Sequence, residues 1–154
     1  MSVLSADAIE FLTPEPEPLW TFAYVSRPTI AFSEEELSRL HHTSEGLNRR
    51  YGLTGRLVVV ERRGVAVRFV QCLEGPRQEI EAGSRRIFRD PRHGDIVVIQ
   101  SAEISTRRFA GWSMHFETVA EADIGLDVAV ALWNADAERT AAVEREAART
   151  VSRG

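Results

Sequence analysis

Residues 54–75 have the sequence TGRLVVVERRGVAVRFVQCLEG, in which two short apolar runs flank the turn Arg62–Arg63–Gly64. Apolar runs of this length on either side of a glycine-containing turn are typical of a β-hairpin. The two strands are expected at about 54–61 and 65–75. We therefore place a hairpin near the middle of the chain, and the flanking segments supply the elements around it.

A strand and a helix are predicted before this hairpin. The run LWTFAYVS (19–26) is apolar and aromatic, which suits a buried strand. Ser33 with Glu36 three residues later forms a capping box, and Gly52 occupies the usual position of a helix end. Between these signals, one face of the predicted helix carries residues at helical spacing, namely Leu37, Leu40, Ser44 and Leu47.

A second helix and two further strands are predicted after the hairpin. Pro76 lies where a helix can begin, and the segment RDPRHGD (89–95) is a turn. Strands are expected at 96–102 and around 112–119. The order β-α-β-β-α-β-β, with two helices on one face of a mixed or antiparallel sheet, is the ferredoxin-like arrangement of the α+β class.

The two ends of the chain differ from this central domain. Residues 1–18 end in TPEPEP and are interpreted as an N-terminal arm, with a short turn of helix around Ala6–Phe11. Residues 19–119 form the folded domain, and residues 120–154 form a helical extension. That extension is expected in two pieces separated near Asn134–Asp136, covering the sheet face that the main helices leave open.

Composition limits the classes of function. The chain of 154 residues suffices for one domain, and its 44% hydrophobic and 27% charged residues are those of an ordinary globular protein. No apolar run approaches the roughly 20 residues needed to span a bilayer, and no secretory signal is visible, so a cytoplasmic protein without membrane contact is expected. The net charge of −4 argues against direct nucleic-acid binding. The single cysteine, Cys72, excludes an internal disulfide.

Three polar residues stand where the pattern calls for apolar ones. Tyr24 lies inside an apolar strand, Gln71 interrupts the run between Phe69 and Leu73, and Asn48 lies one turn after Ser44. Buried polar groups without partners cost about 1–3 kcal/mol each. The three side chains could therefore satisfy one another in the core, or they could line a ligand site. The residues alone leave both alternatives open.

An ordered series of motifs resembles the BLUF family, the blue-light sensors that use FAD. The series is AYVS (23–26), HTSEGLNRRYGLTG (42–55), FVQCLEG (69–75), RDPRHGD (89–95) and RRFAGWSMHF (107–116). These motifs extend over about residues 19–118 in the order of the predicted elements. The resemblance implies that the chain binds FAD without a covalent bond, between its two main helices.

The resemblance also assigns roles to individual residues. Tyr24 corresponds to the photochemical tyrosine, Gln71 to the switching glutamine, and Asn48 to the asparagine that holds a flavin carbonyl. Trp112 and Met114 match a pair on the last strand, one of which approaches the glutamine depending on state. Further contacts with the flavin or its ribityl and phosphate groups are implied for Ser44, Asp90, Arg92 and His93. No metal site is expected.

Several positions depart from the family pattern. Leu47 replaces a polar residue, which implies one missing cofactor contact and weaker flavin binding. The hairpin 54–75 is about five residues longer than usual, so a bulge is expected if Gln71 is to face the flavin. Arg56 and Arg68 bring charge into the strands, and we interpret them as facing solvent or reaching a partner.

The resemblance predicts a sensor, not an enzyme. It groups this chain with short BLUF proteins that signal by protein–protein contacts, either in a homo-oligomer or with a downstream signalling protein. The expected output surface is the last strand and the C-terminal helices, with Val143, Ala147 and Val151 on one stripe. Two alternatives are an interaction module of ferredoxin-like fold that has lost flavin, and a flavin-dependent redox enzyme. No nicotinamide motif supports the second alternative.

Overall fold

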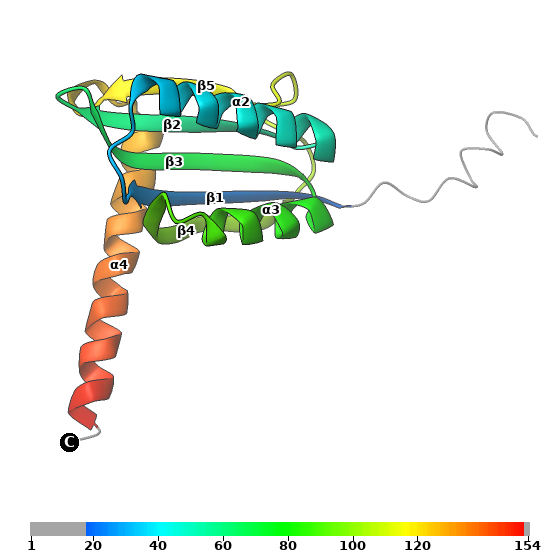
Figure 1. Ribbon diagram of the computed structural model, residues 1–154. Helices are drawn as coiled ribbons and strands as arrows, with labels where there is room; N and C mark the ends of the chain where they lie inside the picture. The colour runs from blue at the N-terminus through cyan, green and yellow to red at the C-terminus, as the bar shows by residue number, and fades with distance from the viewer. Residues whose placement is uncertain (1–17, 153–154) are drawn as a thin grey trace, which may run out of the picture.

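The computed structural model describes residues 18–152, so the arm and its expected turn at Ala6–Phe11 lie outside the described residues. The domain begins with strand β1 and helix α2 and continues through a hairpin, helix α3 and two further strands (Figure 1). Its elements are β1 (Leu19–Pro28), α2 (Glu34–Tyr51), β2 (Thr54–Arg62), β3 (Val65–Pro76), α3 (Arg77–Arg89), β4 (His93–Ile104), β5 (His115–Ala120), a short 3-10 turn at Glu121–Asp123 and α4 (Leu126–Ser152).

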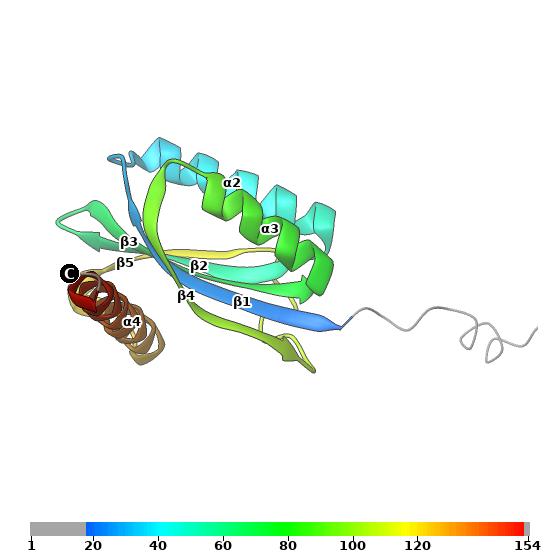
Figure 2. The same cartoon turned by 90° about the horizontal axis from the view of Figure 1, so that it is seen from below.

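The five strands form one mixed sheet in the order β4-β1-β3-β2-β5. All neighbouring strands are antiparallel except β2 and β5, which run parallel. Helices α2 and α3 lie side by side on one face of this sheet, and α4 lies on the other (Figures 1 and 2). The predicted α+β fold is confirmed, with helices on one face and a C-terminal helix behind the sheet.

Local sequence signals correctly predicted the positions of helix α2 and of the β2–β3 hairpin. The Ser33 side chain accepts a hydrogen bond from the Glu36 backbone N–H at 3.1 Å, and Gly52 ends the helix with a left-handed φ of 67°. In the hairpin, Val60 pairs with Arg68 but Glu61 pairs with Ala66, so Val67 is the extra residue of a bulge. The predicted bulge is therefore confirmed.

The main core lies between the sheet and the two helices. Its buried residues come mainly from β1, β2, β3, α2 and α3, and they include Phe22, Tyr24, Leu37, Leu57, Val59, Phe69, Leu73 and Ile80. Two smaller clusters on the opposite face join the sheet to the first half of α4. The polar positions Tyr24, Asn48 and Gln71 are all buried, so the sheet–helix interface is where a ligand site has to be sought.

The prediction of a broken C-terminal helix is wrong. Residues Leu126–Ser152 form one helix of 27 residues. The helix propensities of Asn134 and Asp136 cost only a fraction of a kcal/mol each, and tertiary contacts outweigh them. Ala135 is 1% exposed against the sheet, and Asp136 accepts a hydrogen bond from Arg68 at 2.8 Å.

The first half of α4 covers part of the open sheet face, whereas its second half extends past the edge of the sheet (Figure 1). Arg56 and Arg68 do not simply face solvent, because they bind this extension. Arg56 donates hydrogen bonds to Glu117 and Asp127, and Arg68 donates one to Asp136. Within residues 18–152, no helix has the length and apolar character needed to cross a membrane.

Candidate functional site: a pocket between two helices and the sheet

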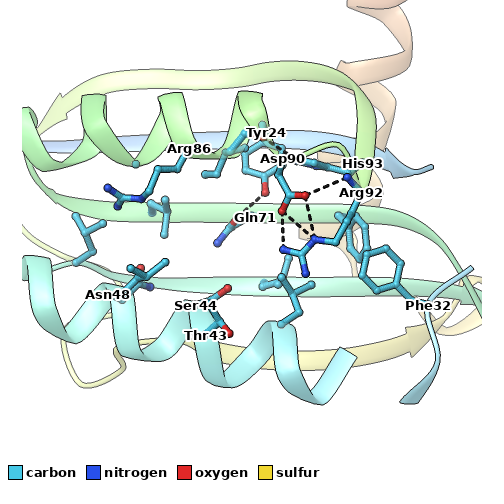
Figure 3. A pocket seen from close by; sticks show the side chains of 18 residues that line it. Tyr24, Phe32, Thr43, Ser44, Asn48, Gln71, Arg86, Asp90, Arg92 and His93 are labelled. Atoms are coloured by element: carbon cyan, nitrogen blue, oxygen red, sulfur yellow. Dashed lines mark hydrogen bonds and ion pairs between the residues drawn. The ribbon is translucent and has the colours of Figure 1, made fainter. Parts of the chain in front are cut away.

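A pocket opens between α2, α3 and the face of the sheet that they cover (Figure 3). Its floor is formed by β1, β2 and β3, and its walls by the two helices and the turn after α3. Apolar side chains supply much of the surface, and polar ones converge from several elements. Seven predicted contact residues line it together: Tyr24, Ser44, Asn48, Gln71, Asp90, Arg92 and His93.

The floor of the pocket carries a buried hydrogen bond between two neighbouring strands. Tyr24 on β1 is directly opposite Gln71 on β3, and their side chains are 4% and 7% exposed. The Tyr24 hydroxyl donates a hydrogen bond to Oε1 of Gln71 (Figure 3). Burial and the nearby negative charge of Asp90 raise the pKa of Tyr24 well above its usual value. Tyr24 is therefore a neutral donor at physiological pH.

The inner face of α2 supplies an amide and two hydroxyls. Asn48 is 5% exposed, and its Nδ2 donates a hydrogen bond to the backbone carbonyl of Ser113 at 2.5 Å. Its Oδ1 accepts no hydrogen bond from residues 18–152 and remains available to a ligand. Ser44 and Thr43 stand one turn earlier, along the same side of the pocket (Figure 3).

The opposite wall carries a charged pair and a histidine. Arg92 binds the Asp90 carboxylate through Nε at 2.9 Å and through its terminal nitrogen at 2.6 Å. These hydrogen bonds lower the pKa of Asp90 below its usual value. His93 has both ring nitrogens engaged, with Ser26 Oγ at 2.7 Å from Nδ1 and the Ile87 carbonyl at 2.8 Å from Nε2. Since a carbonyl only accepts, Nε2 carries the proton, and the imidazole can meet a ligand only through its ring face and edge.

Trp112 and Met114 lie outside this pocket. The prediction that they stand on the last strand is wrong, because β5 begins at His115 and both residues belong to the connection after β4. Trp112 is 51% exposed, and its ring stacks on His115 with centroids 4.4 Å apart. Met114 is 6% exposed and packs into the same core cluster as Tyr24. Hydrogen bonds to Gly55 and Asn48 hold this segment in a turn instead of a longer strand.

Comparison with known proteins agrees with this geometry. The family model described as sensors of blue light using FAD, BLUF, matches residues 19–115. The chain belongs to the BLUF family. It is a blue-light photoreceptor domain, and the matched range contains all of the ordered motifs except the last residue of RRFAGWSMHF (107–116).

Several BLUF proteins are similar to this chain in sequence or in fold. Subunit beta of the photoactivated adenylate cyclase of Euglena longa is 35% identical over 97 residues, which are 62% of this chain and 11% of the relative. The dark state of BlrB, a BLUF protein, has 34% identity and a TM-score of 0.60 over 66% of this chain and 74% of that one. The BLUF domain of BlrP1 has 31% identity and a TM-score of 0.56 over 66% of this chain and 65% of that one. The chain spans about 11% of the length of the photoactivated adenylate cyclase beta subunits of Euglena longa and Euglena gracilis.

The BLUF pocket has the donor set that a flavin ring requires. A flavin presents a planar apolar ring system with carbonyls, ring nitrogens and one N–H along its polar edge. The Gln71 amide nitrogen makes no hydrogen bond within residues 18–152, so it is free to donate into the cavity. Asn48 adds a further amide, and the Asp90 carboxylate can accept from an N–H. Phe32, Leu40, Leu57 and Ile87 supply the apolar surface.

Sequence reasoning missed Arg86, which lines the pocket, and Glu74, which is buried on the other side of β3. Arg86 on α3 lines the pocket at the end opposite Arg92, and its guanidinium lies 4.8 Å from the centroid of the Tyr51 ring (Figure 3). Its position one helical turn after Gly83 could have indicated an inward-facing residue. Glu74 is fully buried beneath the loop after β4. The sequence contained no local signal for this burial, because its partners follow it by 34 and 35 residues.

Proposed function

We propose that the BLUF domain binds FAD in the pocket between α2 and α3 and switches state through Tyr24 and Gln71. The observation that carries this proposal is the buried hydrogen bond from the Tyr24 hydroxyl to Oε1 of Gln71. A glutamine held in this way presents its amide nitrogen to the cavity. The bound flavin would supply the light absorption and accept an electron from a neighbouring side chain.

Tyr24 has the chemistry for the first step. Its phenol is neutral, buried and in contact with a single acceptor, so it can release an electron and a proton together over a short distance. The proton has a defined path, because the Gln71 carbonyl oxygen is its hydrogen-bond partner. His93 lies close to the same ring, with centroids 5.8 Å apart, but its nitrogens are occupied by Ser26 and Ile87.

Gln71 has the chemistry for the switch. Its side chain ends in a donor and an acceptor on one head. In the structure the acceptor faces Tyr24 and the donor faces the cavity. Rotation or tautomerisation of this head exchanges the two roles, which changes the hydrogen bonds that reach a flavin ring without breaking any covalent bond. A small red shift of flavin absorption is the expected optical result.

The remaining pocket residues would hold and orient the cofactor. Asn48 would donate the second hydrogen of its Nδ2 to a ring carbonyl, and the Asp90–Arg92 pair would present a carboxylate and a guanidinium to the polar edge of the ring. Ser44 and His93 would contact the ring or its ribityl chain. The choice of FAD over FMN is supported by the family description. Leu47 lines the pocket with an aliphatic chain, which favours weaker binding than a polar residue would give.

Output would pass through protein–protein contacts made by the β4–β5 connection and α4. The exposed face of α4 carries large apolar side chains, among them Leu126, Trp133 and Val151. Such groups are enriched where proteins associate. A homo-oligomer or a separate signalling protein would be the recipient. The relatives named as photoactivated adenylate cyclases support a regulatory role for such domains.

The test is the absorption spectrum of purified protein in darkness and after blue light. A flavin spectrum that shifts to the red and recovers in the dark is expected. Tyr24→Phe should bind flavin but lose the normal photocycle, and Gln71→Leu should bind flavin but lose the shift. Tyr51→Phe is the matched control and should keep both. A protein that stays colourless after incubation with FAD would instead favour the flavin-free interaction module.

A further inference from the structure

The connection between β4 and β5, residues 105–114, is anchored by a fully buried carboxylate. Glu74 lies on β3, three residues after Gln71, and its side chain is 0% exposed. Its carboxylate accepts hydrogen bonds from the backbone N–H of Arg108, at 3.0 Å from each oxygen, and from that of Phe109 at 2.9 Å. The Arg108 guanidinium is 3.8 Å away. A buried charge is expensive unless it is satisfied, and these two peptide donors satisfy it.

Further hydrogen bonds attach the same connection to the helix and strands around the flavin pocket. The Arg107 guanidinium donates to the Gly52 carbonyl at 2.9 Å and to Thr54 Oγ1 at 3.0 Å. Nearer β5, the Gly55 N–H donates to the Trp112 carbonyl at 3.2 Å. Asn48, which lines the pocket, holds the Ser113 carbonyl. Trp112 and Met114 are therefore carried on a segment with one anchor on β3 and another on α2.

Gln71 and Glu74 are an odd number of residues apart, so their side chains point to opposite faces of β3. Gln71 faces the flavin pocket, while Glu74 faces the connection that carries Trp112 and Met114. A displacement of β3 produced at Gln71 would therefore reach this connection through a short strand segment and two charge-assisted hydrogen bonds. Within residues 18–152, Glu74 is the only carboxylate that accepts hydrogen bonds from this connection.

We propose that Glu74 is a positioning residue that couples the Gln71 switch to the β4–β5 connection, holding Trp112 outside and Met114 inside in the dark state. The coupling rests on the proposed function, since it transmits a change that begins at Gln71. The anchoring of the connection by Glu74 does not rest on the proposed function, because it exists in darkness as well.

The experiment uses the full chain with Trp20→Phe and Trp133→Phe, so that Trp112 is the only tryptophan. Iodide quenching of its fluorescence reports how exposed it is, in darkness and under blue light. Glu74→Gln keeps the size of the side chain, but it removes the charge and turns an amide donor toward the peptide donors. Glu121→Gln is the matched control, because it removes the charge of a carboxylate that binds Arg62 on β2 and involves neither the connection nor His115, on which Trp112 stacks.

In Glu74→Gln the flavin red shift should persist, since Tyr24 and Gln71 are unchanged. Iodide quenching of Trp112 in darkness should move to the lit-state value of the parent, and light should then change it by less than half as much. Dark recovery should accelerate about tenfold, a factor typical for losing a hydrogen bond to a charged group. Glu121→Gln should match its parent in all three measurements.

Three outcomes would overturn the proposal. Unchanged dark quenching in Glu74→Gln would refute the anchoring, whether or not the protein responds to light. Altered dark quenching with recovery within twofold of the parent would refute the coupling. An absent red shift in the parent would instead refute the proposed switch and, with it, the coupling. If Glu74→Gln does not fold, Glu74→Asp carries the same criteria, because it keeps the charge but is one methylene too short to reach both peptide donors.

Discussion

The hydrogen bond between Tyr24 and Gln71 should be measurable as a coupling energy. Tyr24→Phe removes the only donor to Gln71 Oε1 among residues 18–152 and leaves that oxygen buried. The net loss of one hydrogen bond is about 1 kcal/mol, and an unpaired buried acceptor adds about 1–3 kcal/mol. Because the pocket can admit water, we take the lower part of that range and expect a loss of about 2 kcal/mol in the free energy of unfolding.

Gln71→Leu leaves the Tyr24 hydroxyl without an acceptor and should cost about the same, about 2 kcal/mol. The double variant lacks both partners, so neither group remains unsatisfied. Its cost should be less than the sum of the single costs by about 1–2 kcal/mol, which is the coupling energy of the pair. For a chain of this length, 2 kcal/mol corresponds to a fall in Tm of about 4–8 °C.

The assay is urea unfolding of wild type, both single variants and the double variant at one fixed excess of FAD. The dissociation constant of each variant is measured separately, because bound ligand adds its own stabilisation. Tyr51→Phe serves as the control for the loss of a tyrosine outside the pair. A coupling energy below about 0.5 kcal/mol would show that the two side chains act independently, and it would refute the assignment of their hydrogen bond.

Three further changes test other parts of the molecule. Ala135→Leu should overpack the face of α4 against the sheet and cost about 1–3 kcal/mol with flavin absorption retained; unchanged stability by urea unfolding would mean that this face is not packed. The Arg56 hydrogen bond lowers the pKa of Asp127, so its stabilisation is present at neutral pH and lost as pH falls. The difference in Tm between wild type and Asp127→Asn should therefore begin to shrink as pH falls to about 4, where the carboxyl of the unfolded chain takes up its proton, and it should disappear only below the lowered pKa of folded Asp127. A difference that does not shrink as pH falls through this range would exclude this ion pair as its source. In Tyr51→Phe, where Tyr24 is the only tyrosine, absorbance at 295 nm should stay flat past about pH 10 and rise only on unfolding, because the unfolded chain ionises first; an earlier rise in folded protein would contradict the raised pKa of Tyr24.

The elements around the site could be predicted because their signals are local. Ser33, Glu36 and Gly52 mark the ends of α2 within a few residues of the groups they cap. The hairpin follows from two apolar runs and one glycine, and its extra length required the bulge that the structure contains at Val67. The polar interruptions at Tyr24, Asn48 and Gln71 identified a site, since few polar groups are tolerated in a core without a partner or ligand.

Features that depend on distant partners could not be predicted in the same way. The break expected near Asn134 follows from propensity, but Ala135 and Asp136 are held in the helix by a sheet formed much earlier in the chain. The intramolecular partners of Arg56 and Arg68, and the place of Trp112 before β5, were not predicted for the same reason. Each is decided by residues that lie tens of positions away.

The amino-acid sequence alone accounts for the order of the elements, the face of β3 that carries Gln71 and the chemistry of the pocket. These depend on periodicity, on caps and on which residue types can donate or accept a hydrogen bond. The parallel pairing of β2 with β5, the burial of Glu74 beneath Arg108 and Phe109, and the outward position of Trp112 were decided only by the folded structure. Such features are set by packing and hydrogen bonds between segments far apart in the chain, whose free energies exist only once the sheet has brought those segments together.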